Sequence, residues 1–317
     1  MGSALVTGAA GFIGSHLCAR LRSEGIRVRG IDSMSSHYAR ALKELNLAAL
    51  AHDPEFTFEE IDLLDCDPGA LTDGIDVVFH LAARPGVRDS WSDFDDYVRN
   101  NVRATKVLLD AFVDSPAPFV YASSSSVYGN AAALPVSEDA PRTPISPYGA
   151  TKVMTEVMAG AYAAAHGLHT VGLRYFTVYG PRQRPDMGLA KFIESAAAGR
   201  PIAIYGDGRQ LRDFTYVDDV VEATLLAARH GRGGSVYNVA SSNPQPLLTV
   251  LEALGEVLGA ELELVHEENK LGDVRDTWGD VSRAASDLGY APTATLDEGL
   301  ARQAAEAERR RSLLAAR

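Results

Sequence analysis

The chain has 317 residues, of which 46% are hydrophobic and 23% charged, and its formal net charge at pH 7 is -12. This composition is that of a globular protein with one large domain or two modest ones, and it excludes a disordered, highly charged chain. The acidic balance argues against a nucleic-acid partner, because such binding depends on Lys and Arg. The sequence contains two cysteines and no apolar run long enough to span a membrane. We therefore expect a cytoplasmic protein without disulfides, a membrane partner or a bound metal.

The first half of the sequence alternates short apolar runs with stretches of helical spacing. We expect strands at Ala4–Val6, Val28–Ile31, Phe56–Ile61, Val77–Leu81, Phe119–Ala122 and Thr170–Leu173. Helices are expected at Phe12–Arg22, Asp95–Phe112 and Tyr148–Ala165. Repeated βαβ units with right-handed crossovers predict an α/β fold, with a doubly wound parallel sheet of the Rossmann type.

The regular alternation ends near residue 175, and prolines then separate shorter elements. We expect residues 1–175 to form a Rossmann domain and residues 176–317 to form a smaller C-terminal substrate-binding lobe. Residues 236–240 are apolar enough to return to the main sheet as a late strand. The Ala-rich segment after Leu300 is expected to be helical.

A glycine-rich turn follows the first expected strand. Gly8 permits a sharp turn, Gly11 lets backbone N–H groups approach a pyrophosphate, and Gly14 lets helix and strand pack closely. Asp32 ends the second expected strand, where a carboxylate binds both ribose hydroxyls and repels a 2′-phosphate, so the pattern favours NAD over NADP. Other expected cofactor contacts are Phe12, Ile13, Asp62, Leu63, Leu81, Ala82 and Ala83. The alternative is that Asp32 merely begins a loop and Asp62 is a turn residue.

Tyr148 and Lys152 are four residues apart, so on a helix both project from one face. A nearby cation favours the phenolate and lowers the pKa of a tyrosine toward working pH, as a general base requires. Ser124 lies in a run of four serines just past the fifth expected strand, where its hydroxyl can bond to a reacting oxygen. A Tyr-x-x-x-Lys pair also occurs by chance, and a serine run is also typical of a solvent-exposed loop.

These motifs, together with Val127-Tyr128-Gly129 and Arg212-Asp213-Phe214, are spread over nearly the whole chain. In combination they resemble the nucleotide-sugar epimerases and dehydratases of the extended short-chain dehydrogenase/reductase family. The resemblance implies that Tyr148 is the catalytic base and that Ser124 orients the sugar 4-hydroxyl. It also implies that Lys152 holds the nicotinamide ribose and that Asn101 lies near the cofactor. In this family a 4-keto sugar forms transiently while NAD carries the hydride, and the cofactor is regenerated in each turnover.

The sugar chemistry is indicated by residues beside the serine run. Related dehydratases and decarboxylases carry carboxylates where this chain has Ser125 and Ser126, so dehydration is disfavoured and simple 4-epimerisation remains. The stretch Arg174–Pro181, which includes Thr177, resembles UDP-glucuronate 4-epimerases, as does Gly86-Val87-Arg88. The resemblance implies that the three hydroxyls hold the uronate carboxylate, with Arg88 and Arg184 balancing charge.

Further substrate contacts are expected along the second half of the chain. By resemblance, Arg212 and Arg275 grip the diphosphate, Asp276 binds the uridine ribose, and Lys191 also contacts the substrate. Each arginine is alternatively a surface salt-bridge partner. The resemblance also implies a homodimer formed through the helices at 95–112 and 148–165.

Two other functions remain open from the sequence. The first keeps the fold and changes the substrate, giving an epimerase, reductase or dehydratase of a neutral UDP- or dTDP-hexose. The second is a cofactor-sensing protein without turnover, which would not need Tyr148, Lys152 and Ser124 together.

Overall fold

The computed structural model describes residues 1–268 and 270–315. Its centre is a parallel sheet of seven strands in the order β11-β6-β5-β4-β1-β2-β3. The strands are β1 (Ser3–Thr7), β2 (Arg27–Asp32), β3 (Phe56–Glu60), β4 (Val77–His80), β5 (Phe119–Ser124), β6 (Thr170–Tyr175) and β11 (Ser235–Val239). The predicted α/β fold with a doubly wound parallel sheet is confirmed.

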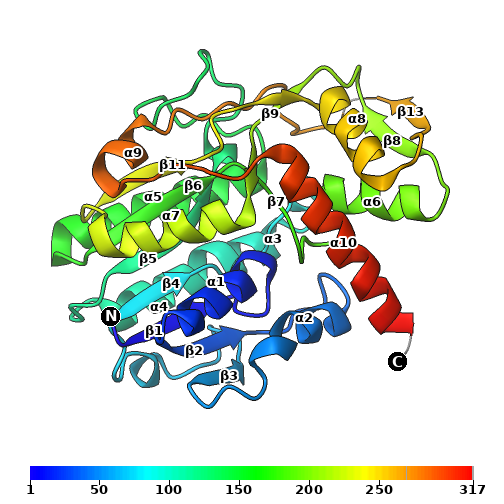
Figure 1. Ribbon diagram of the computed structural model, residues 1–317. Coiled ribbons are helices and arrows are strands. Elements are labelled where there is room, and N and C mark those ends of the chain that lie inside the picture. The colour runs from blue at the N-terminus through cyan, green and yellow to red at the C-terminus, as the bar shows by residue number, and fades with distance from the viewer. Residues whose placement is uncertain (269, 316–317) are drawn as a thin grey trace.

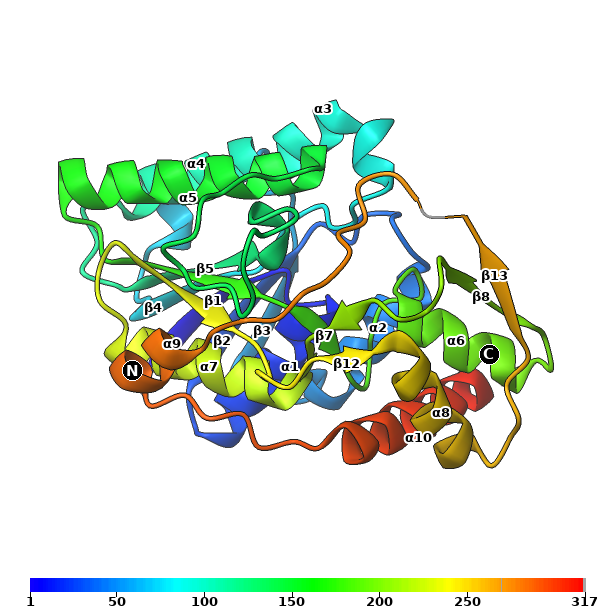
Figure 2. The ribbon, with the colours of Figure 1, turned by 90° about the horizontal axis from the view of Figure 1, so that it is seen from above.

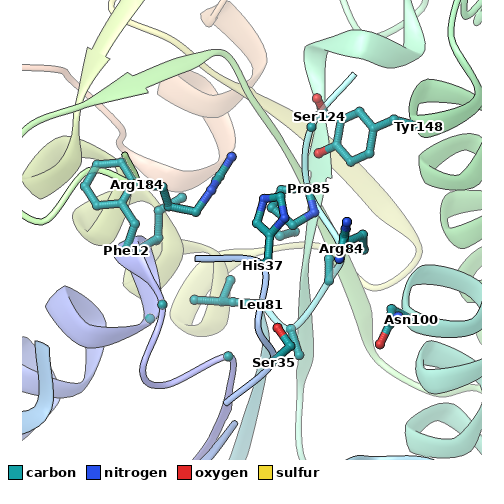
Figure 3. A pocket seen from close by; sticks show the side chains of 18 of the residues that line it. Phe12, Ser35, His37, Leu81, Arg84, Pro85, Asn100, Ser124, Tyr148 and Arg184 are labelled. Atoms are coloured by element: carbon teal, nitrogen blue, oxygen red, sulfur yellow. The ribbon is translucent and has the colours of Figure 1, made fainter. Parts of the chain in front are cut away.

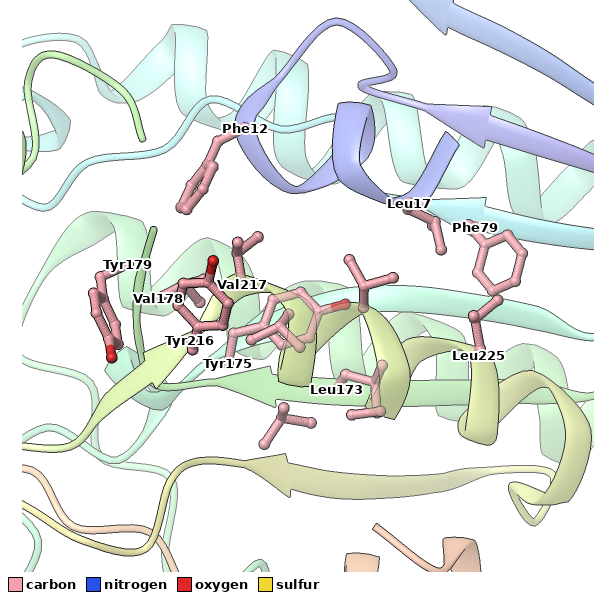
Figure 4. Packing of buried hydrophobic residues seen from close by; sticks show 14 of the residues in the cluster. Phe12, Leu17, Phe79, Leu173, Tyr175, Val178, Tyr179, Tyr216, Val217 and Leu225 are labelled. Atoms are coloured by element: carbon pink, nitrogen blue, oxygen red, sulfur yellow. The ribbon is translucent and has the colours of Figure 1, made fainter. Parts of the chain in front are cut away.

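Helices cover both faces of this sheet, as Figure 2 shows: α4 and α5 on one face, α1 and α7 on the other. Their bounds are α1 (Phe12–Ser23), α2 (Arg40–Leu47), α3 (Phe94–Tyr97), α4 (Ala104–Phe112), α5 (Pro147–His166) and α7 (Val217–His230). Alternate residues of β1 serve the two layers: Ala4 and Val6 pack in the α1/α7 core, and Leu5 packs in the α4/α5 core. Figure 4 shows the first core, with Phe12, Leu173 and Val217 among its members.

The helix expected at 95–112 is a composite. Between α3 and α4 the structure places a π-helical segment, Val98–Arg103, which helical periodicity did not indicate. Short 3₁₀ turns lie at Ala48–Leu50, Pro68–Leu71, Asp89–Trp91 and Ser125–Val127. Among the described residues, no helix is both long and apolar enough to cross a membrane.

The remaining elements are gathered beyond the carboxyl ends of the strands (Figure 1). Within the part of the chain that the structure describes, three two-stranded sheets pair β7 (Thr177–Tyr179) with β10 (Phe214–Tyr216), β9 (Leu211–Arg212) with β12 (Gln245–Pro246), and β8 (Ile202–Tyr205) with β13 (Leu264–Glu267). The helices here are α6 (Gly188–Ala197), α8 (Leu247–Leu258) and α10 (Leu296–Ala315). Helix α9 (Ser282–Leu288) is the exception, because it packs against α7 and β11. The expected helix after Leu300 is therefore the larger part of α10.

Helix α10 connects distant parts of the chain. It packs against α8 and α6 and runs toward α2 (Figure 1). Gln303 on α10 accepts a hydrogen bond from the Gly180 N–H at 2.9 Å and donates one to the Gln183 side chain at 2.7 Å. Farther along, Arg310 donates to Asn46, whose amide in turn donates to the Ala10 carbonyl at 2.7 Å. One helix thus supports both the loop after β7 and the glycine turn after β1.

Candidate active site

A cavity of about 710 Å³ opens at the carboxyl ends of β1, β2, β4 and β5 (Figure 3). This edge is where open parallel sheets bind ligands. Sequence-predicted residues that line it are Gly8, Gly11, Phe12, Ile13, Gly14, Asp32, Asp62, Leu63, Leu81, Ala82, Ala83, Ser124, Ser125, Ser126, Tyr148, Lys152, Thr177 and Arg184. Most of the predicted site is therefore brought to one cavity.

The glycine turn is built for close approach. Gly8 has φ of +74°, and a Cβ on Gly14 would lie 2.1 Å from the Gly8 carbonyl oxygen, so both positions need glycine. Helix α1 then begins with Gly11 as N-cap, without a side-chain cap and without an acidic residue in its first turn. Its N-terminal N–H groups and its dipole thus favour an anion, as the pyrophosphate of a dinucleotide requires.

Two carboxylates stand at the neighbouring strand ends. Asp32 accepts hydrogen bonds from the Met34 N–H at 2.8 Å and from the buried Lys43 ammonium at 3.2 Å. Asp62 accepts one from Arg99 at 2.8 Å. Lys43 also lines the cavity, so a cation stands beside the carboxylate predicted to bind the ribose.

Tyr148 and Lys152 of α5 line the cavity together with Ser124 at the end of β5. Figure 3 shows Tyr148 beside Ser124. Pro147 at the start of α5 and Ser146, which caps the helix by accepting from the Gly149 N–H at 3.1 Å, fix where this helix begins. The Lys152 ammonium donates to the Ala122 carbonyl at 2.9 Å. These contacts fix the phenol and the ammonium on one wall of the cavity.

The electrostatics of these groups differ from the prediction. Burial raises the pKa of Tyr148, although a hydrogen bond to Ser124 and the charge of Arg184 oppose the rise. The expectation that Lys152 would bring the Tyr148 pKa down is therefore wrong for this structure, because desolvation of the phenolate dominates. Burial lowers the pKa of Lys152 to about 8, against the opposing charge of Glu156.

Hydroxyl groups and one arginine complete the far end of the cavity. Ser124 and Ser126 bond to each other through their side chains at 3.1 Å, and Thr177 lies in the same lining. Arg184 is held by two 3.0 Å bonds to Asp186. Burial opposes ionisation of Asp186, but hydrogen bonding to His37 and the charge of Arg184 outweigh it and lower its pKa. The Arg184 charge is thus partly compensated.

The chain matches a known protein family over most of its length. The sequence pattern of the NAD dependent epimerase/dehydratase family matches residues 4–240. The chain belongs to this family. It is an NAD-dependent enzyme, and the glycine turn with Asp32 is the part of the cavity that fits the cofactor.

Solved structures and curated relatives agree with this placement. The UDP-glucuronic acid 4-epimerase of Bacillus cereus, solved with UDP-glucuronic acid and NAD, is 40% identical with a TM-score of 0.94, covering 97% of this chain and 99% of that one. The UDP-N-acetylglucosamine 4-epimerase of Methanobrevibacter ruminantium M1 is 31% identical with a TM-score of 0.91, covering 98% and 99%. The UDP-glucuronate 4-epimerase of Thermodesulfobacterium geofontis is 38% identical over 95% of each chain.

Six predicted residues of this enzyme do not line the cavity. Arg88 pairs with Asp273 at 2.9 Å, and its guanidinium lies 4.3 Å from the centre of the Tyr205 ring. Arg212 donates to the carbonyls of Leu211, Val274 and Arg275, and Asp276 accepts from the Leu211 N–H. The structure therefore brings Arg88, Arg212, Arg275 and Asp276 to one loop region, where their contacts are within the protein. Their roles toward the diphosphate and ribose stay predictions.

The other two lie apart from that region. Lys191 is an exposed residue of α6. Asn101 is buried in the π-helical segment, where its side chain accepts from the Arg84 N–H at 2.7 Å and donates to Thr151 at 3.0 Å. It therefore reaches the cavity through the backbone of Arg84, which does line it.

Sequence reasoning missed several residues of the site. Lys43, Arg84 and His37 line the cavity, and Glu156 lies directly behind it. Lys43 and His37 follow β2 in a stretch with no motif, so no local signal pointed to them. Glu156 did have a signal, because it follows Lys152 by four residues on the same helix.

Proposed function

We propose that the protein is an NAD-dependent 4-epimerase of nucleotide sugars and that its substrate is UDP-glucuronate. The observation that carries the proposal is the placement of Ser125, Ser126 and Thr177 in the cavity that also contains Tyr148. Hydroxyl donors at this end suit a carboxylate, and serines at 125 and 126 supply no second acid or base for dehydration. Relatives named for UDP-glucuronate support the choice.

The chemistry follows from the positions of the side chains. Tyr148 must act as the phenolate, a form that burial opposes and that the Ser124 bond and the Arg184 charge favour. Its oxygen then takes the proton of the sugar 4-hydroxyl, which Ser124 orients through its own hydroxyl. Bound NAD would supply the hydride chemistry at C4, which is reversible oxidation of the alcohol to the ketone. The glycine turn, Asp32 and Lys152 would hold the cofactor. Tyr148 then returns its proton to the new 4-hydroxyl.

A uronate needs additional control at the keto stage. A 4-keto uronate is a β-keto acid, and it loses CO₂ when the bond from C5 to the carboxylate stands perpendicular to the ketone plane. Ser125, Ser126 and Thr177 hold the carboxylate in another orientation, and Arg184 balances part of its charge. Retention of the carboxylate is therefore a task of the protein rather than of the cofactor.

The test is conversion of UDP-glucuronate to UDP-galacturonate by the purified protein, followed by chromatography. Thr177→Ala should loosen the carboxylate and yield a UDP-pentose or UDP-4-keto-pentose, together with NADH absorbing at 340 nm. Arg184→Ala should mainly raise KM, because it removes a charge present in the ground and transition states alike. A parent protein that ignores UDP-glucuronate and interconverts UDP-glucose and UDP-galactose would refute the uronate proposal.

A neutral nucleotide sugar is the second candidate. It is favoured by the Arg184–Asp186 pair, because an arginine already neutralised by a carboxylate has less charge to offer an anionic sugar. A relative 38% identical, from Mycolicibacterium smegmatis, is named as a UDP-glucose 4-epimerase. Assay of UDP-glucose and dTDP-glucose beside UDP-glucuronate separates the two candidates.

We also propose that the chain forms two functional lobes. Residues 1–175, together with α7 and β11, form the cofactor lobe, and most of the chain from residue 176 onward forms the substrate lobe. We place the protein in the cytoplasm, where NAD and nucleotide sugars are available. Recovery of the native protein from an extracytoplasmic fraction would contradict that location.

A further inference from the structure

Glu156 is a buried carboxylate that the proposed chemistry does not use. It lies on α5 one turn after Lys152, and only 4% of it is exposed. Its oxygens accept hydrogen bonds from Arg174 at 2.8 Å through two guanidinium nitrogens and from the Ser123 hydroxyl at 2.5 Å. Arg142 donates to it from the surface side at 3.3 Å.

These contacts tie three elements together behind the cavity. Glu156 comes from α5, Arg174 from β6, and Ser123 from the end of β5. Ser123 stands between Ala122, whose carbonyl accepts from Lys152, and Ser124, whose hydroxyl bonds to Tyr148. The carboxylate therefore restrains the backbone on which both of those partners are carried.

Glu156 is charged at neutral pH. Burial opposes its ionisation, but the hydrogen bonds and charge of Arg174 outweigh burial and hold its pKa below the ordinary value. A buried ion pair contributes little net stability compared with well-packed apolar side chains, because desolvation offsets the attraction. A gain in stability therefore does not explain the carboxylate at this position. The explanation is sought in the effect of the Glu156 charge on neighbouring groups.

The charge of Glu156 acts on Lys152. His80 of β4 is the other titratable group whose charge is coupled to Lys152, whereas Arg174 of β6 and Arg142 of the loop before α5 bond to Glu156 itself. Burial lowers the pKa of His80 to about 3, so it is neutral. The charge of Glu156 supports the protonated form of Lys152, while burial opposes it.

We propose that Glu156 is a positioning residue for the epimerisation proposed above: its carboxylate fixes the end of β5 against α5 and maintains the ammonium form of Lys152. The inference rests on the proposed function only for the role of Lys152 in turnover. The effect on Lys152 itself is a property of the protein and can be measured through cofactor binding.

The test is Glu156→Gln, which keeps the shape and removes the charge. Rates and NAD dissociation constants are measured from pH 6 to 9.5, the latter by calorimetry without sugar. In the parent, the rate should fall and the NAD dissociation constant should rise as the pH passes about 8, where Lys152 loses its proton. In Glu156→Gln this alkaline limb should move down by about one pH unit, because the charge that supports the ammonium is gone.

Two further variants separate charge from structure. Asp110→Asn is the matched control, since Asp110 also bonds to a residue of α5, Tyr162, but lies on the surface away from the cavity. It should leave the limb unchanged. Ser123→Ala keeps the Glu156 charge and removes the hydrogen bond that ties β5 to α5. It should therefore lower kcat without moving the alkaline limb. If Glu156→Gln does not fold, Glu156→Asp replaces it, with a smaller shift in the same direction.

An alkaline limb of NAD binding that stays at the parent position in the Glu156 variant, with only the melting temperature lowered, would overturn the proposal. Failure of the proposed function looks different. In that case UDP-glucuronate is not converted by the parent, while the limb of NAD binding still moves in the variant.

Discussion

At the scale of single residues, Tyr148 carries the sharpest prediction. Its phenol is held against Ser124, and its ring meets Tyr97 at 6.2 Å between ring centres. Tyr148→Phe keeps the ring and removes the only atom that can exchange a proton. We expect turnover to fall at least about a hundredfold, the scale for losing a positioned base, with the NAD dissociation constant nearly unchanged. Near-parent turnover in a steady-state assay would show that another group moves the proton.

The residues predicted from sequence are those with local spacing. Gly8, Gly14, Tyr148 and Lys152 are recognisable because their roles depend on neighbours a few positions away, and the structure places all four at the cavity. Lys43 reaches Asp32 only through the fold, 11 positions along the chain, so no pattern could indicate it. The hydrogen bonds of Arg212 to the carbonyls of Val274 and Arg275 likewise join residues that are far apart in the sequence, so no local pattern could indicate them.

Elements were predicted where periodicity is strong. The bounds of most of them shift by one or two residues, whereas α10 begins at Leu296, ahead of the segment expected after Leu300. The helix between residues 95 and 112 shows what periodicity misses. A π-helical segment, Val98–Arg103, interrupts it and buries Asn101. Such a segment inserts an extra residue into a turn, and tertiary contacts such as Asn101 with Arg84 and Thr151 compensate for it. A window that assumes 3.6 residues per turn does not detect it.

Helix α10 gives a prediction at this scale. Gln303→Ala leaves the Gly180 N–H without its bond and removes the partner of Gln183, which also supports Ala190. We expect a loss of about 2 kcal/mol in the free energy of unfolding, measured with urea. KM should rise more than kcat falls, because the loop after β7 carries Arg184.

Arg302→Ala is the control, since that side chain is on the same helix but exposed. It should change the unfolding free energy by less than about 0.5 kcal/mol. Equal effects of the two substitutions would contradict a specific anchoring role for Gln303.

At the scale of the whole molecule, the outer surface of α5 predicts assembly. Met154 and Val157 are 45% and 55% exposed, and a separation of three residues places them on one helix face. Figure 2 shows α4 and α5 side by side at the margin of the molecule. We propose that this face pairs two chains. Light scattering should give twice the chain mass, and Val157→Glu should give a monomer with unchanged circular dichroism; a monomeric parent would rule this interface out.

The placement of β11 and α10 delays part of folding during synthesis on the ribosome. The edge of β6 stays unpaired until Val239 leaves the ribosome, because β11 is its neighbour in the sheet. At 5–20 residues per second, the about 60 intervening residues take roughly 3 to 13 s. An unpaired edge of this kind is a template for association with other chains, so the nascent protein carries an aggregation-prone edge during that interval. The glycine turn gains its last support later still, when Arg310 reaches Asn46.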